Sequence, residues 1–135
     1  MLLRSVPLIF RRRPGRTTKK RADAPAPPAA ALVLVEAAFD ETAPTIRLTF
    51  DRAIDIDGLV GSQIVVDDGA MTGTRYEAVG EANLDGPNGV FIQLLEVGPA
   101  QNAGTVLTAS AGTGIVAVDD GGTWAGATDV ALPYP

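Results

Sequence analysis

The sequence predicts an all-β protein, a sandwich of seven to eight short antiparallel strands that follows an extended N-terminal arm. Residues 45–50 alternate between apolar and polar side chains, and a period of two is typical of a strand with one buried face. Glycine and proline make up 25 of the 135 residues (15 and 10), which indicates many tight turns. No stretch has a sustained period of 3.6 residues with helix caps, so we expect little helix.

The strand at residues 45–50 is the one around which the rest is organised. Its apolar side chains alternate with polar ones that include two β-branched threonines, which suit a pleated surface. Successive side chains of a strand point to opposite faces, so the apolar face needs a second sheet to cover it. The expected core contains apolar residues from three strands: Ile46, Leu48, Phe50, Ile92, Leu94 and Val106.

The other strands are inferred from apolar runs that turn residues separate roughly every 8–12 residues, a spacing typical of a β-sandwich. The expected strands are residues 32–39, 45–50, 63–66, 74–79, 90–97, 105–109, 115–118 and 129–132. The expected turns and connections are residues 40–44, 54–61, 67–69, 83–89, 98–104 and 119–122.

Charge divides the chain into a basic arm and an acidic body. Residues 1–21 hold 8 of the 11 basic residues and no acid, whereas the other 114 residues hold three basic residues and all 16 acids. An arm of +8 is therefore joined to a body of −13, and the net charge of −5 is their sum. Such asymmetry indicates an interaction arm on an acidic domain. We expect the arm to span residues 1–31 and the domain to span residues 32–135.

The arm has three parts. Residues 1–10 are mostly apolar, the basic run follows, and the proline-rich segment 24–29 is predicted to be a stiff, extended spacer. A secretory signal has the reverse order, with the charge before the apolar core. An alternative interpretation takes residues 29–35 as the apolar core of a signal that follows a long basic segment. No apolar run approaches the roughly 20 residues of a membrane-spanning helix.

The basic run is interpreted either as a solvated tail or as a device for electrostatic docking onto an acidic surface. That surface is a protein shell, the acidic body of a neighbouring copy or, less favoured, a nucleic acid. The apolar residues 1–10 favour a protein, and the absence of aromatic residues among the arginines disfavours stacking on single-stranded nucleic acid. The expected partner-binding residues are Phe10, Arg11, Arg12, Arg13, Arg16, Lys19, Lys20, Arg21 and Trp124.

Trp124 is the only tryptophan, and Gly122 and Gly126 lie two residues away on either side. A tryptophan in this setting is either a plug over one end of the core or an exposed anchor for a partner or a glycan.

The composition offers few of the side chains that catalysis usually needs. Histidine and cysteine are both absent, which removes the usual general base, any disulfide and any thiolate metal site. Serines are present, but no histidine can activate them, and the scattered carboxylates do not form an obvious pair for cutting sugars. We therefore expect a protein that is not an enzyme and needs no cofactor.

Calcium is the one metal that the acidic turns could hold through hard oxygen ligands. The candidates are Asp51, Asp55 and Asp57 with Gly58, or Asp119 with Asp120. Their spacing matches only part of a calcium-binding loop, and ordinary turn chemistry explains the same residues. We expect no tight metal site.

Three segments carry a family resemblance: Ile-Arg-Leu-Thr-Phe-Asp-Arg-Ala-Ile-Asp at 46–55, Ala-Gly-Thr-Val-Leu-Thr-Ala at 103–109 and Gly-Ile-Val-Ala-Val-Asp-Asp-Gly-Gly at 114–122. They resemble the bacterial immunoglobulin-like domains of surface-layer proteins and adhesins. The resemblance covers about residues 32–132 and implies an immunoglobulin-like β-sandwich. It implies no catalytic residue.

Together these observations favour a non-enzymatic structural or accessory protein of a larger assembly. The best expectation is a phage virion component, a capsid decoration or tail protein that is made in the host cytoplasm and docks through its basic arm. The alternative is an exported bacterial module at the cell surface that serves adhesion or carbohydrate binding.

Overall fold

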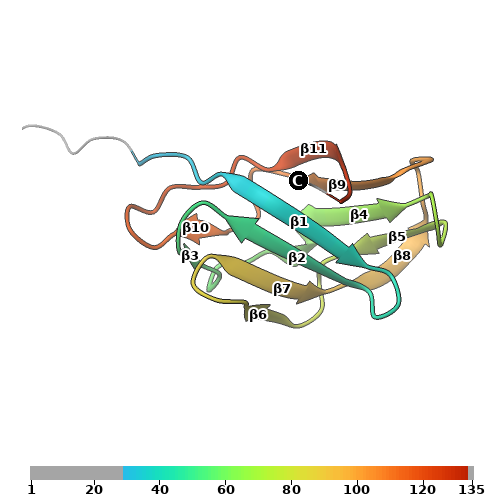
Figure 1. The fold of residues 1–135 in the computed structure, drawn as a ribbon, viewed down its shortest axis with the longest axis horizontal. Coiled ribbons are helices and arrows are strands. Elements are labelled where there is room, and N and C mark those ends of the chain that lie inside the picture. The colour runs from blue at the N-terminus through green and yellow to red at the C-terminus, as the bar shows by residue number, and fades with distance from the viewer. Residues whose placement is uncertain (1–28, 134–135) are drawn as a thin grey trace, which may run out of the picture.

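The computed structural model describes residues 29–133 of the chain. This part is built of antiparallel β-sheets, with one short 3₁₀ helix at Gly61–Gln63 (Figure 1). The predicted all-β class is therefore confirmed.

The first sheet has four strands in the order β1-β2-β7-β6, and every neighbouring pair is antiparallel. Its strands are β1 (Leu34–Asp40), β2 (Thr45–Phe50), β7 (Gly89–Gln93) and β6 (Ala82–Leu84). The strand predicted at 45–50 occupies the inside of this sheet as β2. Ile46 lies opposite Phe39 of β1 and Ile92 of β7, so the apolar positions of three strands share one face.

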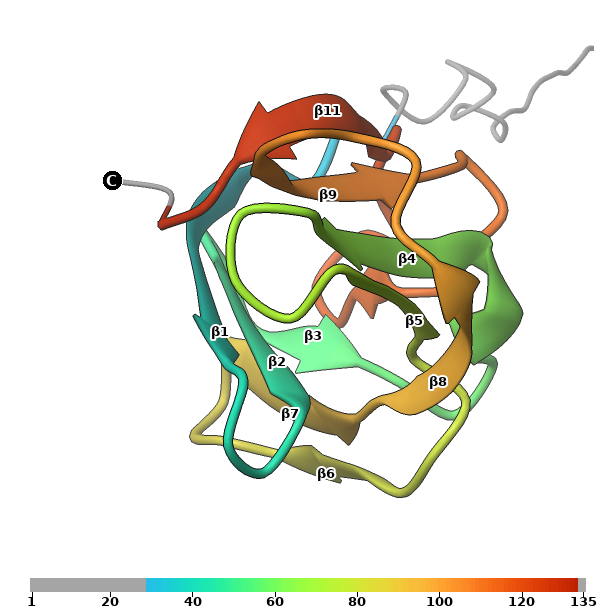
Figure 2. The ribbon, with the colours of Figure 1, turned by 90° about the vertical axis from the view of Figure 1, so that its right-hand side faces the viewer.

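The second sheet has five antiparallel strands in the order β11-β9-β4-β5-β8. Its strands are β11 (Ala127–Ala131), β9 (Thr105–Ala109), β4 (Ile64–Asp68), β5 (Thr74–Glu77) and β8 (Leu95–Pro99). A third, two-stranded sheet pairs β3 (Ile54–Asp55) with β10 (Val116–Ala117) at one end of the molecule. Figure 2 shows the two large sheets on either side of the interior.

One hydrophobic cluster joins the two large sheets. Ile46, Leu48 and Phe50 of β2 are fully buried, as the alternation in residues 45–50 predicts. Ile92 and Leu94 are buried as well. The second sheet contributes buried side chains from β4 and β9 to the same cluster: Ile64, Val66, Leu107 and Ala109.

The predicted burial of Val106 is wrong by one position. Val106 is half-buried, and its neighbour Leu107 is fully buried. The pairing with β4 explains the difference, because Leu107 lies opposite the buried Val66 and Ala109 opposite the buried Ile64. In a strand with a period of two, this register points Val106 to the other face.

The described residues form eleven strands, three more than the upper number predicted. The predicted connection at 54–61 contains β3, and the predicted turn at 83–89 contains parts of β6 and β7. The run predicted as one strand at 90–97 is β7 and β8, which belong to different sheets. Leu94 between them is buried, and its N–H donates to the carbonyl oxygen of Pro44 over 2.8 Å. That bond marks the point where the chain crosses between sheets.

The strands β1 and β11 bring the edges of the two large sheets together. β1 pairs with β2 and β11 pairs with β9, so each strand has a free edge within the described part of the chain. Both views place the two strands next to each other (Figures 1 and 2). The chain enters the domain at this seam, just before β1.

Candidate functional site: the arm root and the seam groove

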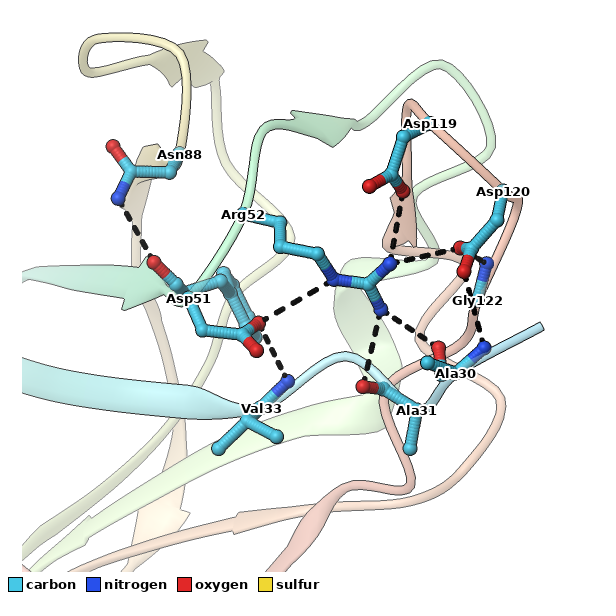
Figure 3. A network of polar contacts seen from close by, with 10 residues as sticks. Ala30, Ala31, Val33, Asp51, Arg52, Asn88, Asp119, Asp120 and Gly122 are labelled. Atoms are coloured by element: carbon cyan, nitrogen blue, oxygen red, sulfur yellow. Dashed lines mark hydrogen bonds and ion pairs between the residues drawn. The ribbon is translucent and has the colours of Figure 1, made fainter.

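The last two residues before the domain, Ala30 and Ala31, are held by the side chain of Arg52. Its Nη2 donates hydrogen bonds to the carbonyl oxygens of Ala30 over 2.7 Å and Ala31 over 3.1 Å (Figure 3). From the other side, the N–H of Ala30 donates to Oδ2 of Asp120 over 3.1 Å. The point where the arm meets the domain is therefore bound on two sides.

Three carboxylates surround the guanidinium of Arg52. Its Nη1 lies 2.9 Å from Asp119 and 2.9 Å from Asp120, and its Nε lies 3.8 Å from Asp51. Burial lowers the pKa of Arg52, but the hydrogen bond to Asp120 and the three negative charges outweigh it and raise the pKa overall. We call Arg52, Asp51, Asp119 and Asp120 the arm-root clamp.

The carboxylate of Asp120 is the most strongly perturbed group of the clamp. The N–H of Gly122 donates to it over 2.9 Å, and Ala30 and Arg52 donate as well. These partners, led by the two backbone N–H groups, lower the pKa of Asp120 to about 2. The carboxylate is thus ionised at any ordinary pH.

Gly122 lies against the arm root and has no room for a side chain. A Cβ at this position would come within 1.8 Å of the carbonyl oxygen of Ala30 and 3.0 Å of Nη2 of Arg52. The turn after β10 therefore needs a glycine here so that its backbone can approach residue 30 closely.

Asp51 extends the clamp by one residue along the chain. Its Oδ1 accepts a hydrogen bond from the N–H of Val33 over 3.1 Å, and its own N–H donates to the carbonyl oxygen of Val33 over 2.9 Å. Asn88 supports the same turn by donating from Nδ2 to the carbonyl oxygen of Phe50 over 2.8 Å. Residues 30–33 are consequently bound at several points to the loops that follow β2 and β10.

The carboxylates considered as calcium ligands have other partners in the structure. Asp51, Asp119 and Asp120 surround Arg52, which already supplies a positive charge. Asp55 accepts a hydrogen bond from the N–H of Asp57 over 2.8 Å, an arrangement typical of an Asx turn. Within residues 29–133, no group of three or more acidic, histidine or cysteine side chains is placed to hold a metal ion.

A groove of about 270 Å³ lies at the start of the seam between β1 and β11, beside the arm root. Its lining is almost entirely apolar: Leu32, Val33, Leu34, Trp124, Ala125, Gly126, Ala127 and Val130. At one end of the groove, which we call its closed end, an isolated β-bridge pairs Leu32 with Trp124. There the N–H of Leu32 donates to the carbonyl oxygen of Thr123 over 3.0 Å. We call this feature the seam groove.

Trp124 forms part of the lining of the groove and of the core beneath it. Its side chain is 3% exposed and packs edge-on against Phe50, with 5.3 Å between the ring centroids. This burial agrees with the interpretation of Trp124 as a plug over one end of the core. The interpretation as an exposed anchor is wrong, because the indole is covered by the chain itself.

A second polar cluster lies at the end of β4, where residues 67–69 are predicted as a turn. Asp67 and Asp68 are instead buried strand residues. Asp68 accepts hydrogen bonds from the hydroxyls of Thr72 and Thr105. Burial raises the pKa of Asp68, but these hydrogen bonds outweigh burial and lower it. The carboxylate stabilises the loop after β4, and we assign it no further role.

Eight of the nine predicted partner-binding residues lie outside the described residues: Phe10, Arg11, Arg12, Arg13, Arg16, Lys19, Lys20 and Arg21. The structure therefore bears on the place where the arm joins the domain. Arg52 is not among the residues predicted from the sequence, although it is one of three basic residues in an acidic body and stands next to Asp51. The seam groove had no sequence signal, because its walls are about 90 residues apart in the chain.

The fold and the site define an all-β protein of antiparallel sheets whose N-terminal segment is clamped at an apolar seam. Comparison with known proteins adds no relative: no protein family, curated protein or solved structure matches this chain. Among the helices of the described residues, none is long and apolar enough to cross a membrane.

Proposed function

We propose that this chain is a non-enzymatic structural protein of a larger assembly, with an immunoglobulin-like β-sandwich that docks through its basic arm. A phage virion component, such as a capsid decoration or tail protein, is the form we favour. The observation that carries the proposal is the arm-root clamp. A domain whose N-terminal segment is bound by Arg52 and Asp120 presents its arm from a defined point on its surface.

Charge supports the proposed docking role. The described residues 29–133 contain 15 acids and three arginines, a net charge of −12, whereas residues 1–21 carry +8. The arm is therefore the part of the chain that can approach an acidic surface without repulsion. The immunoglobulin-like assignment draws on the resemblance of residues 46–55, 103–109 and 114–122 and on the two antiparallel sheets.

The proposed absence of catalysis draws on the inventory of side chains. The whole chain has no histidine and no cysteine. Asp51, Asp68 and Asp120 each accept hydrogen bonds that stabilise the fold. No carboxylate in this group is left poised as an acid or a base.

One observation favours the alternative, an exported cell-surface module that binds carbohydrate. The ring of Phe91 is 43% exposed on the outer face of the first sheet, and its strand neighbours are Arg47 and Asn83. Arg47 also pairs with Asp85. An aromatic ring among polar side chains is a surface on which a sugar can stack.

Co-sedimentation with the assembled partner tests the proposal. Full-length protein should sediment with the assembly, and protein that lacks residues 1–28 should stay in solution. The truncated protein should still fold, because every strand of the described structure begins at or after Leu34. Equal incorporation of both proteins would contradict docking through the arm. N-terminal sequencing of the native protein separates the alternative, because cleavage near Ala37 would support export.

A further inference from the structure

We infer that the seam groove is the receptor for the arm of a second copy, and that it takes apolar side chains from residues 1–10 while Arg11, Arg12 and Arg13 meet the acidic clamp beside it. This inference rests on the proposed function, since it assumes that the arm docks. It names the partner as another molecule of the same chain.

The groove has the form of a binding site for an extended segment. One wall is the segment 32–34, which leads into β1, and the other is the segment 124–127 with Val130 of β11. Val33 on one wall is 52% exposed, and Val130 on the other wall is half-buried. An apolar segment laid between them would remove both side chains from water.

Negative charge is concentrated around the groove. At the closed end, the side chains of Asp51, Asp119 and Asp120 are 37%, 61% and 35% exposed, and they outnumber Arg52 by three to one. Along the walls, β1 carries the exposed Glu36 and β11 carries the exposed Asp129. A ligand of this site should combine an apolar stretch with several positive charges.

The N-terminal residues of the chain have that combination. Apolar residues predominate in the first ten positions: Leu2, Leu3, Val6, Leu8, Ile9 and Phe10. Three arginines follow at once, at 11–13. The apolar stretch matches the groove, and the arginines match the clamp at its end. The pairing of arginine with carboxylate adds direction, because a guanidinium offers a forked set of donors.

The position of the arm root favours a second copy over the same copy. The clamp holds Ala30 and Ala31 at the closed end of the groove, and the sequence predicts a stiff spacer at 24–29. If it is extended as predicted, this spacer of six residues would span about 19 Å at about 3.1 Å per residue, a reach that suits the groove of a neighbouring copy. An interface between the arm of one copy and the groove of the next is heterologous, so copies would join head to tail.

Photo-crosslinking of the full-length chain tests the inference. A photoreactive benzoylphenylalanine replaces Phe10, and unlabelled protein is mixed with an equal amount of ¹⁵N-labelled protein before irradiation. We expect crosslinks from position 10 of one copy to residues 32–34 or 125–130 of another, seen as mixed light and heavy peptide pairs. Crosslinks only within one copy, crosslinks to another surface, or no crosslinks would each overturn the inference.

A matched pair of variants checks the role of the groove. Val33→Asn places a polar side chain on the groove wall, whereas Val97→Asn makes the same change on β8, where Val97 is 48% exposed. We expect Val33→Asn to weaken self-association about tenfold in sedimentation equilibrium, the factor expected for one buried valine, and Val97→Asn to leave it unchanged. Circular dichroism melting curves show whether both variants remain folded. Equal self-association of the two folded variants would overturn the inference.

The two proposals fail in different ways. In one outcome, the full-length chain is monomeric in solution but enters the assembly only when its arm is present. This outcome would overturn the groove as the receptor and leave the proposed function standing. An arm whose deletion changes neither self-association nor incorporation would overturn both.

Discussion

Arg52 donates a hydrogen bond to the carbonyl oxygen of Ala30 over 2.7 Å, which joins the loop after β2 to the C-terminal end of the arm. The two residues are 22 positions apart in the chain. The contact joins the arm root to the loops after β2 and β10, because the same guanidinium also lies next to Asp51, Asp119 and Asp120.

Arg52→Gln should loosen the arm root while the core stays folded. The shorter, uncharged side chain cannot bridge the carbonyl oxygens of Ala30 and Ala31 to the carboxylates. We expect faster hydrogen exchange at the amides of Ala30 and Leu32, with no change in the central strands. Arg47→Gln is the matched control, because Arg47 is exposed and pairs with Asp85 elsewhere. Unchanged exchange in Arg52→Gln would show that the clamp does not hold the arm.

Gly122→Ala should displace the arm root by steric contact alone. The added Cβ would lie 1.8 Å from the carbonyl oxygen of Ala30, which requires a backbone shift. The expected result is a change in the amide chemical shifts of residues 30–33. Gly104→Ala is the control, since a Cβ there meets nothing within 4 Å. Normal shifts in Gly122→Ala would mean that residue 30 does not lie against this turn.

The register of β9 can be tested with two neighbouring substitutions. Leu107→Ala should lower the free energy of unfolding by about 2–5 kcal/mol, because it opens a cavity in the core. Val106→Ala should cost less, because Val106 is only half-buried. Urea denaturation measures both. The opposite order of stabilities would indicate a register shifted by one residue.

The clamp should respond to acid in a defined direction. Asp120 has a pKa of about 2 in the folded chain, below the ordinary value of 3.8. A lowered pKa means that the stabilisation is fully present above pH 3.8 and is lost as the pH falls toward 2. Carboxyl chemical shifts of Asp120 should titrate with a midpoint near 2, and the Arg52→Gln variant should titrate at higher pH. A midpoint near 3.8 in the parent protein would contradict the hydrogen bonds described here.

Replacement of Arg11, Arg12 and Arg13 by serine should weaken incorporation into the assembly in a salt-dependent way. Exposed charges interact over about 10 Å in 0.1 M salt and over about 3 Å in 1 M salt. The parent protein should therefore lose affinity as salt rises, and the variant should show a flatter dependence. Co-sedimentation at several salt concentrations measures both slopes. Parallel slopes would show that the arginines do not contact the partner.

The residue pattern was sufficient for the class of fold and for most of the core. Alternation around Ile46, Leu48 and Phe50 identified β2 and its buried face, because a period of two is a local property of the chain. The division of charge between arm and body can also be read along the sequence without any structure. The high content of glycine and proline correctly indicated short strands joined by many turns.

Tertiary structure alone decided which of two equivalent patterns was used. In Thr-Val-Leu-Thr-Ala of β9, either Val106 or Leu107 could face inward, and pairing with β4 selected Leu107. The run at 90–97 reads as one strand, but the chain crosses between sheets at Leu94. Such choices depend on partners far away in the sequence, which no local period contains.

The candidate site, too, was decided entirely by the tertiary structure. The clamp joins Ala30, Arg52 and Asp120, and the groove joins residues 32–34 with residues 124–130. By itself the sequence determined an acidic all-β domain with a basic arm, because charge and hydrophobic period are properties of neighbouring residues. Only the folded chain decided where the arm is held and which surface lies beside it, because hydrogen bonds and apolar contacts between distant segments form when the two sheets close around their core.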